Sequence, residues 1–319
     1  MNRFSIIGAA HLDALVEGID ETALQAGSSP AERIRLGFGG DALNEAVTLA
    51  RLGGDVDLVS KIGCDNAGDM VLDYCRSVGL PSAHIAREEN LSTSMNIVLI
   101  DRAGERRFIT DPNSSLRALA LSDVLPRVEM LAHVVCFASL FVFPRFDAET
   151  LTTLFSAIKA RGCLLAADMT RRKRGEKLRD LASVWPLIDI LFANAEEAGL
   201  LTEAKTVEDM AEEMRGAGVA CVVIKTGARG CYVASEGFRG AVQGSVSRAC
   251  VDTTGAGDNF AAAFLFARAA GRKEEDCARF ANAVASICVE HLGATAHEIT
   301  QEQALARCRE NYGAGFDRL

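Results

Sequence analysis

The stretch Asp252-Thr253-Thr254-Gly255-Ala256-Gly257-Asp258 decides how this chain is interpreted, because it places small residues and a carboxylate directly before an apolar, alanine-rich segment, 259–270. Gly255, Ala256 and Gly257 let the backbone approach a ligand closely, and glycine also permits positive φ. Their N–H groups would open a helix, where free donors and the positive end of the helix dipole attract an anion. Asp258 would stand in the first turn. Amide donors beside a base predict transfer of a phosphoryl group to a hydroxyl.

The composition is that of a folded globular protein: 319 residues, of which 49% are hydrophobic and 24% charged. The net charge of −9 argues against a nucleic-acid or membrane-surface partner. The N-terminal run 1–10 is too short for a signal peptide, and the longest apolar stretch, 130–143, is too short to cross a bilayer. Ten scattered cysteines match no C-x-x-C or zinc spacing, which favours buried free thiols in a reducing compartment. We therefore expect a cytoplasmic protein.

Apolar runs of strand length alternate with helical patterns along most of the chain. The expected strands are 4–10, 56–62, 134–138, 163–168, 188–193 and 219–225, with short antiparallel strands within 227–246. The expected helices are 41–52, 66–78, 148–160, 177–184, 195–201, 207–215, 256–270, 274–290 and 301–311. This alternation predicts an α/β fold, with a mostly parallel sheet between two layers of helices.

Two segments break the alternation and predict a small separate sheet. Residues 12–19 alternate like a half-buried strand, and 94–110 read as a hairpin that turns at 102–105. We expect a single domain, 1–319, with a β lid formed by approximately 12–36 and 92–112.

A second glycine-rich segment, Gly37-Phe38-Gly39-Gly40-Asp41-Ala42, matches the pattern G-x-G-x-x-A. A dinucleotide site would require a core strand before it and an acidic residue about 20 residues later, at the end of a strand. Residues 31–36 are too charged for a core strand, and Asp57 precedes its strand. The glycines could simply turn into a helix. We favour substrate binding at the helix N-terminus, with Asn44 pointing from the first turn into the same cleft.

Further polar residues follow predicted strands, and ligands of open α/β sheets bind where strands end. Asn194 and Glu197 either cap the next helix or order Mg²⁺ and its waters beside phosphate groups. Lys225, Thr226 and Gly227, with Gly230, either form a hairpin turn or contact the phosphate or ribose of a nucleotide.

Three other features have both a structural and a functional interpretation. Asp13 is either a turn residue or an acceptor for substrate hydroxyls. Arg106 either is solvated or reaches down to the substrate. The basic run Arg171-Arg172-Lys173-Arg174, just past Asp168, is either a solvated loop or lies near the phosphates.

In this order, the segments resemble the PfkB carbohydrate kinase family, also called ribokinase-like, over nearly the whole chain. The first signature region is Gly39-Gly40-Asp41-Ala42-Leu43-Asn44-Glu45-Ala46, followed by Ala50-Arg51-Leu52-Gly53. The second is Asp252-Thr253-Thr254-Gly255-Ala256-Gly257-Asp258-Asn259-Phe260. The resemblance implies an αβα sandwich with a β lid, which pairs into homodimers in some members. It also implies an enzyme that uses ATP and Mg²⁺ to phosphorylate a small sugar or nucleoside.

The resemblance implies a role for each matching residue. Asp258 takes the catalytic base position, and the amides of Gly255, Ala256, Gly257 and Asp258 form the anion hole. Substrate-contact positions fall on Asp13, Gly39, Gly40 and Asn44. Nucleotide positions fall on Asn194, Lys225, Thr226, Gly227, Gly230 and, near the adenine, Asn282. Glu197 would hold Mg²⁺ through water, and many members bind a monovalent cation such as K⁺ where Asp252 stands here, with carbonyls near Thr254 and Gly293.

Two departures leave the substrate open. Many sugar kinases of the family carry D-x-N-x-R after the central strand, whereas Asp168-Met169-Thr170-Arg171-Arg172 has Thr in place of Asn. The segment 8–13 lacks the Glu or Asn that is common near its start. The Gly-Gly-Asp-Ala-Leu-Asn form looks more like the fructokinase and ketodeoxygluconate-kinase side than the nucleoside-kinase side. The sequence thus predicts a sugar kinase. Its alternatives are a nucleoside kinase, a non-catalytic sugar or nucleotide sensor, and a dinucleotide oxidoreductase.

Overall fold

The computed structural model describes residues 3–20, 25, 27–102, 105–295, 297–313 and 315–316. Parts of the predicted lid, at 21–24 and 26, and of its predicted turn, at 103–104, lie outside the described residues. The strands are β1 (Arg3–Ile7), β2 (His11–Ile19), β3 (Arg33–Gly39), β4 (Asp55–Gly63), β5 (Ile85–Glu88), β6 (Met95–Asp101), β7 (Arg106–Ile109), β8 (Val134–Leu140), β9 (Leu164–Met169), β10 (Ile190–Asn194), β11 (Cys221–Lys225), β12 (Gly230–Ala234) and β13 (Arg239–Gln243). The helices are α1 (Asp41–Arg51), α2 (Asn66–Ser77), α3 (Leu121–Val124), α4 (Ala148–Ala160), α5 (Ala195–Thr202), α6 (Val207–Gly216), α7 (Ala256–Ala269), α8 (Glu274–Cys288) and α9 (Gln301–Tyr312).

Nine of the described strands form the central sheet, in the order β13-β12-β11-β10-β9-β8-β1-β4-β5. The pairs from β5 to β11 are parallel, and β12 and β13 join antiparallel at one edge. Parallel strands that are covered on both faces are apolar along their whole length, which is why they appeared in the sequence as continuous apolar runs. The predicted parallel sheet is confirmed.

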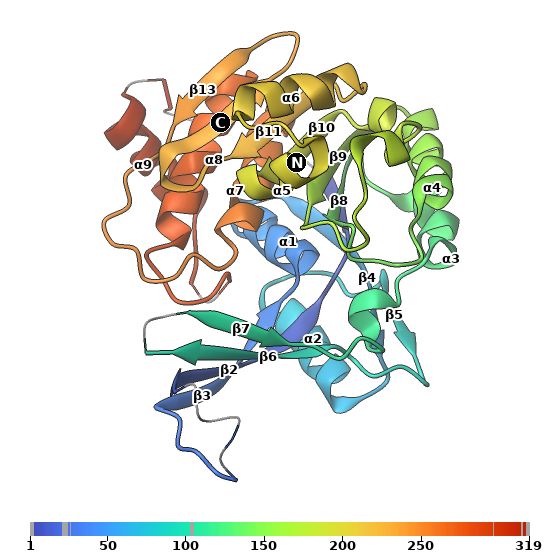
Figure 1. Cartoon of the computed structure of the whole chain (residues 1–319), viewed down its shortest axis with the longest axis vertical. Coiled ribbons are helices and arrows are strands. Elements are labelled where there is room, and N and C mark those ends of the chain that lie inside the picture. The colour runs from blue at the N-terminus through green and yellow to red at the C-terminus, as the bar shows by residue number, and fades with distance from the viewer. Residues whose placement is uncertain are drawn as a thin grey trace.

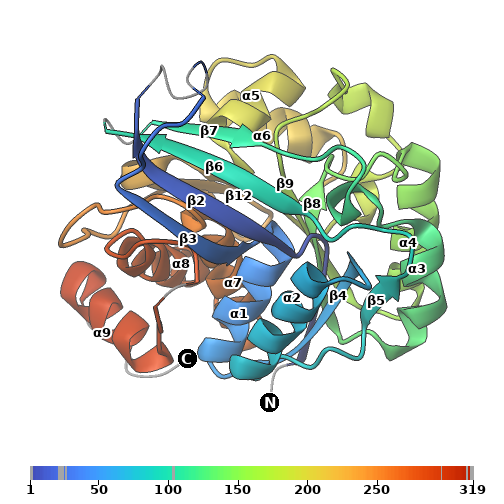
Figure 2. The same cartoon turned by 90° about the horizontal axis from the view of Figure 1, so that it is seen from below.

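Helices cover both faces of this sheet (Figures 1 and 2). Successive residues of a strand point to opposite faces, so Ile6 and Ile7 of β1 belong to two different clusters of buried side chains. The cluster around Ile6 includes Phe264 of α7, and the cluster around Ile7 includes Phe155 of α4. Helices α1, α2, α7, α8 and α9 therefore lie on one face, and α3 to α6 lie on the other.

The predicted lid is a separate four-stranded sheet in the order β3-β2-β6-β7, which Figure 1 shows in the lower part of the view, below α1. The charged segment 31–36, a poor candidate for a core strand, falls mainly in β3, which pairs antiparallel with β2. Asp13 pairs in register with Asn96 of the parallel neighbour β6. The next row across the sheet is apolar and partly exposed, and it consists of Leu36, Ala14, Ile97 and Ile109.

One predicted helix, 177–184, is wrong. Two short 3₁₀ turns, Leu178–Leu181 and Trp185–Leu187, occupy this region instead. The indole Nε1 of Trp185 donates to the carbonyl of Leu178 at 2.6 Å, an acceptor that a continuing α-helix would have used itself. Pro186 has no N–H with which to continue the helix.

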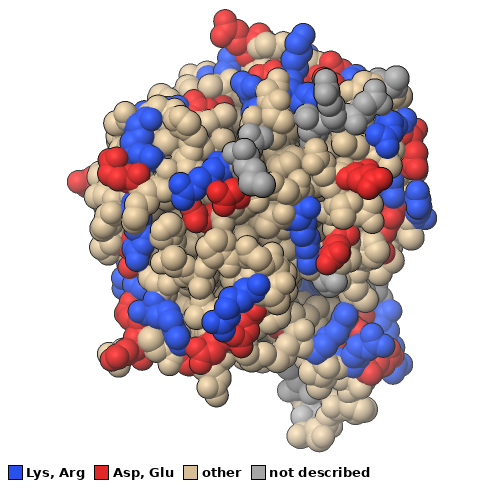
Figure 3. All heavy atoms as spheres, turned by 180° about the vertical axis from the view of Figure 1, so that it is seen from behind, with Lys and Arg blue, Asp and Glu red and all other residues tan. Residues whose placement is uncertain are grey.

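The cysteines are free, as their spacing predicted, and the charged side chains are spread over the surface (Figure 3). All ten cysteines are free thiols, and eight of them are buried. On the face shown in Figure 3, acidic and basic side chains lie interspersed rather than gathered by sign. Among the described helices, none has the length and apolar character that a membrane span requires.

Candidate active site

The backbone makes a tight turn at the start of α7. Gly255 stands just before the helix in the left-handed region, at φ 72°. A Cβ at this position would lie 2.1 Å from the Cβ of Ala294, so no larger residue fits. At Gly257 a Cβ would lie 3.3 Å from the Nζ of Lys225. The two glycines therefore let this turn pack closely against its neighbours while its N–H groups open the helix.

Asp258 lies in the first turn of α7 and accepts a hydrogen bond from Asn44 Nδ2 at 2.7 Å. Packing of α1 against α7 fixes this pair, because Thr48 Oγ1 donates to Asn259 Oδ1 at 2.9 Å. Asn259 Nδ2 in turn donates to the carbonyls of Gly255 and Ala294, at 2.8 and 3.1 Å. Asp258 and the turn at 255–257, the predicted anion turn, are thus held by one network.

Burial raises the pKa of Asp258 to about 6. Burial is the largest cause of this net value. The carboxylate of Asp168 also acts to raise the pKa, whereas the hydrogen bond from Asn44 and the charge of Lys225 act to lower it. The group is mostly ionised at neutral pH and still basic enough to take a proton, which suits a general base.

A cavity of about 480 Å³ lies beside this turn, over the carboxyl ends of β9, β10 and β11. At its floor, Lys225 Nζ donates to both carboxylate oxygens of Asp168, at 2.9 and 2.8 Å, and both side chains are nearly buried. This pairing raises the pKa of Lys225, which stays charged. The lining residues include the predicted nucleotide positions Asn194, Lys225, Gly227, Gly230 and Asn282.

Asn194 and Glu197 form a capping box at the start of α5. Asn194 Oδ1 accepts from the Glu197 N–H and Glu197 Oε2 accepts from the Asn194 N–H, both at 2.8 Å. The structural interpretation of this pair is therefore realised, and both residues also line the cavity. Burial raises the pKa of Glu197 to about 7, so a nearby cation would favour its ionised form.

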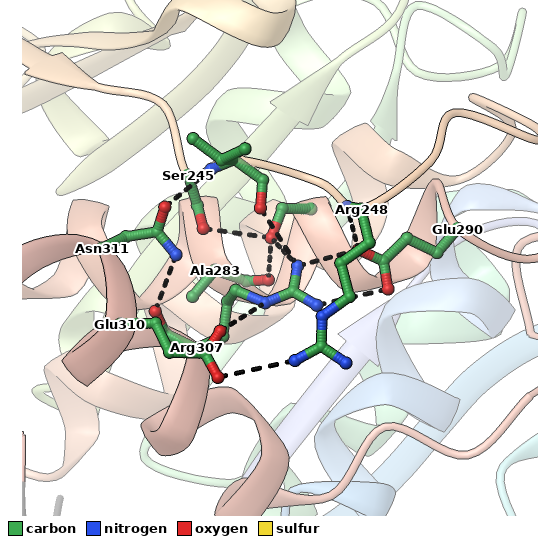
Figure 4. A network of polar contacts seen from close by, with 9 residues as sticks. Ser245, Arg248, Ala283, Glu290, Arg307, Glu310 and Asn311 are labelled. Carbon is green, nitrogen blue, oxygen red and sulfur yellow. Dashed lines mark hydrogen bonds and ion pairs between the residues drawn. The ribbon is translucent and has the colours of Figure 1, made fainter.

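The outer wall of the same cavity is the segment 243–250, which α8 and α9 hold in place (Figure 4). The buried Arg307 of α9 donates to Ser286 Oγ at 2.9 Å and to the carbonyl of Val246 at 3.3 Å, and it pairs with Glu290 at 3.0 Å. Glu290 Oε1 accepts the N–H of Arg248 at 2.6 Å. Nearby, Asn282 Nδ2 and the hydroxyl of Tyr312 donate to the carbonyl of Gln243, at 3.1 and 2.8 Å.

A second cavity, of about 360 Å³, lies between the lid and the carboxyl ends of β1 and β9. Its lining residues are Ala9, His11, Gly40, Asp41, Asn96, Phe108, Thr110, Leu116, Arg117, Val142, Thr170 and Lys173. Asp41 and Thr170 line both cavities, so the two join there, and Asp258 lines the first of them. Asp13 stands at the rim, where it accepts from Asn96 at 3.0 Å and lies 3.3 Å from His11 Nε2. Gly39 leaves room for it, because a Cβ there would lie 2.4 Å from Asp13 Oδ2.

The lid is tied to the anion turn by an ion pair. Arg106 Nη2 of β7 lies 2.5 Å from Asp252 Oδ1, whereas we expected Arg106 either in solvent or at the substrate. Asp252 also accepts the N–H groups of Thr254 and Gly293, each at 2.8 Å. These contacts engage both oxygens of the residue that was expected to bind a monovalent cation.

The structure brings most of the predicted residues to these two cavities, with informative exceptions. Thr226 closes its turn, because its hydroxyl donates to the carbonyl of Gly230 at 2.9 Å. The dinucleotide alternative for 37–42 is wrong, since β3 is a lid strand outside the parallel sheet. Sequence reasoning assigned no role to Asn259, although it directly follows Asp258, and it assigned none to Arg307.

The chain is similar to a known protein family and to proteins of known structure. The family model described as "pfkB family carbohydrate kinase" matches residues 1–301. The chain is 25% identical to 2-dehydro-3-deoxygluconokinase of Haemophilus influenzae, over 86% of this chain and 93% of that protein. It is 29% identical to fructokinase-1 of Oryza sativa subsp. japonica, over 84% of this chain and 87% of that protein. Among solved structures, Arabidopsis thaliana ribokinase, complexed with ribose and ATP, superimposes with a TM-score of 0.82 at 24% identity, covering 97% of this chain and 99% of that one.

Proposed function

Because this chain belongs to the pfkB family of carbohydrate kinases, we propose that it transfers the γ-phosphoryl group of ATP to a hydroxyl of a sugar or sugar-like substrate. The observation that carries the proposal is the position of Asp258. It lines the first cavity, which joins the second at Asp41 and Thr170, and it stands in the first turn of α7 beside the amides that open that helix.

Each part of the site has a task in this reaction. Asp258 accepts the proton of the attacking hydroxyl, while Asn44 keeps its carboxylate aimed into the junction. The N–H groups of Gly255, Ala256, Gly257 and Asp258 stabilise the charge that develops on the transferred group. Lys225 adds a fixed positive charge from the floor, and its bond with Asp168 holds it in place. Positioning and charge stabilisation supply most of the acceleration in phosphoryl transfer.

We propose that Asn194 and Glu197 face the phosphates together with Mg²⁺. The capping box leaves one Glu197 oxygen outside its two hydrogen bonds, which suits a metal held largely through water. Among the described residues, no group of three or more His, Cys, Asp or Glu side chains is arranged to hold a metal directly. Bound Mg²⁺ would neutralise phosphate charge, and Glu197 would orient its waters.

A monovalent cation such as K⁺ at Asp252 is a separate proposal, and Arg106 competes with it. The guanidinium already places a positive charge on this carboxylate. We therefore propose that K⁺ acts here only when Arg106 is displaced. Arg106→Gln should make turnover rise with K⁺, whereas the parent enzyme should respond weakly. An equal response in both proteins would contradict this.

We also propose that two copies pair through their lids. Leu36, Ile97 and Ile109 form an exposed apolar row across the lid sheet, and they are 51%, 39% and 47% exposed. Exposed apolar patches on a sheet often mark an interface. Light scattering on Ile97→Lys should then report a monomer where the parent chain reports a dimer. A parent chain that is already monomeric would refute the pairing.

The substrate class is tested by an ADP-release screen over sugars, sugar acids, sugar phosphates and nucleosides. The named relatives support a sugar substrate over a nucleoside, which stays the second candidate. Release of ADP with a sugar, lost in Asp258→Asn, is the expected result. Tight sugar binding without ADP formation would favour a non-catalytic sensor, for which the site and the relatives give no support.

A further inference from the structure

We propose that the substrate is an anionic sugar, whose carboxylate or phosphate group binds Arg117 and Lys173 while the hydroxyl to be phosphorylated faces Asp258. This inference rests on the proposed sugar-kinase function, because it concerns the cavity beside Asp258. It assigns the recognition of charge to two residues outside both signature regions.

Arg117 is held in position by its backbone. It ends a 3₁₀ turn, Ser115–Arg117, that is tied to the segment entering β6. The Ser115 N–H donates to the carbonyl of Ser92 at 2.9 Å, and Ser115 Oγ accepts the Ser94 N–H at 2.9 Å. The side chain is half-buried and lines the second cavity, beneath the lid, which we call the substrate cavity.

Within the described residues, the guanidinium of Arg117 makes no hydrogen bond or ion pair. A guanidinium carries five donors and always stays charged, so its partial burial without an acceptor is unfavourable. A bound carboxylate or phosphate would supply that acceptor, since arginine matches both groups with two parallel hydrogen bonds.

Lys173 differs from the other three residues of its basic run in its contacts. The other three side chains contact protein groups: Arg171 lies 3.2 Å from Glu196, Arg172 donates to the Glu176 carbonyl at 2.8 Å, and Arg174 donates to the Pro144 carbonyl at 3.0 Å. Lys173 lines the substrate cavity, and over the described part of the chain its ammonium has no such contact.

Among the described residues, none of the neighbouring carboxylates forms an ion pair with Arg117 or Lys173. Beyond Arg117 and Lys173 lies an adjoining cavity lined by Asp147, Glu176 and Asp180. Each of these three accepts backbone N–H bonds from its own segment. Asp41, in the substrate cavity itself, has a pKa raised by burial and by the charge of Asp258, so it is less charged than a free carboxylate. The substrate cavity thus has a positive end at Arg117, and at Asp41 and Thr170 it joins the first cavity, which Asp258 lines.

This polarity orients the substrate. An anion at the Arg117 end places the opposite part of a small sugar toward Asp258, which fixes the hydroxyl that is presented to the phosphoryl group. A neutral sugar would leave Arg117 without its acceptor. The anionic form should therefore bind more tightly, and selection should appear mainly in KM.

The test is an ADP-release assay on the full chain with matched neutral sugars, sugar acids and sugar monophosphates. Arg117→Gln and Lys173→Gln are compared with Arg171→Gln, a control in the same basic run that removes an exposed cation paired with Glu196. For the preferred anionic sugar, Arg117→Gln should lower kcat/KM by roughly 10- to 100-fold, the range for hydrogen bonds to charged groups. Most of that loss should come through KM. The neutral analogue should change little, and Arg171→Gln should keep the parental selectivity.

The outcomes separate this inference from the kinase function. Phosphorylation of neutral sugars in preference to their acids and phosphates, unchanged in Arg117→Gln, would overturn the anion site and leave the kinase intact. Arg117-dependent thermal stabilisation by an anionic sugar, without ADP release from any sugar, would support the anion site and refute the kinase. The acid and phosphate arms identify which anion is bound. Lys173 is exposed, so Lys173→Gln tests selectivity even if Arg117→Gln fails to fold.

Discussion

Replacing the base, Asp258→Asn, should make the protein more stable at neutral pH while it removes most of the activity. The stability part follows from the raised pKa of Asp258, about 6 against a reference value of 3.8. Below the reference value this carboxyl is protonated in both the folded and the unfolded chain and contributes no pH-dependent term. As pH rises from 3.8 to about 6, the unfolded chain loses this proton before the native protein does, so stability falls and the full penalty is present at neutral pH.

The size of the penalty follows from the shift. A difference of about 2 pKa units at about 1.4 kcal/mol each gives an upper value of about 3 kcal/mol. Asp258 lines an open cavity, where water screens part of this cost, so we expect a gain of about 1–3 kcal/mol for the neutral amide. The amide keeps an oxygen that can accept the hydrogen bond from Asn44.

The activity should fall at the same time. Loss of a general base typically lowers kcat by roughly 10²- to 10⁴-fold. The parent enzyme should itself lose activity as pH falls below about 6, because Asp258 then becomes protonated. That acidic limb should be absent from the residual activity of Asp258→Asn.

Urea unfolding between pH 4 and pH 8, together with steady-state kinetics over the same range, checks both parts. Asp73→Asn on α2 is the matched control, because it removes an exposed carboxylate that is paired with Arg76. The reasoning is refuted if Asp258→Asn is no more stable than the parent at pH 7, or if its gain is the same at pH 4. Near-normal turnover would remove Asp258 from the role of base.

Three further substitutions test the surroundings of the base. Lys225→Met leaves Asp168 buried without its partner, so the free energy of unfolding should fall by about 3–5 kcal/mol in urea titrations, and KM for ATP should rise. Gly255→Ala puts a Cβ 2.1 Å from that of Ala294 at φ 72°, which should cost about 1–3 kcal/mol in the same titrations and lower kcat. Arg307→Met loosens the wall at 243–250, so KM for ATP should rise several-fold while KM for the sugar stays unchanged. Equal changes in both KM values would contradict the assignment of that wall to the nucleotide.

The sequence predicted the parts of this protein that depend on local pattern. Continuous apolar runs indicated the parallel sheet, and the small residues before α7 indicated the anion turn. Both signals lie within a few neighbouring residues. The helix predicted at 177–184 was wrong because the indole of Trp185 takes a carbonyl of the first turn, a contact that periodicity does not contain.

Contacts between distant segments were not predictable in this way. The pairs Lys225–Asp168 and Arg106–Asp252 join residues 57 and 146 positions apart, so each partner alone looked like an ordinary strand-end or hairpin charge. Arg117 lies in a short segment with no regular period. Its proposed role in anion binding follows from the cavity that it lines and from the absence of an acceptor among the described residues. Both are properties of the folded chain.

The wall held by Arg307 has a consequence for the order in which the enzyme is made. Residues 243–250 bound the cavity that we assign to the nucleotide, and two of the side chains that fix them, Asn311 and Arg307, come from α9, some sixty positions later. A ribosome releases the chain from its N-terminus, so the sheet, the lid and the sugar cavity can assemble while α9 is still inside the exit tunnel. We therefore expect the growing chain to form the cavity beneath the lid before the wall at 243–250 is fixed.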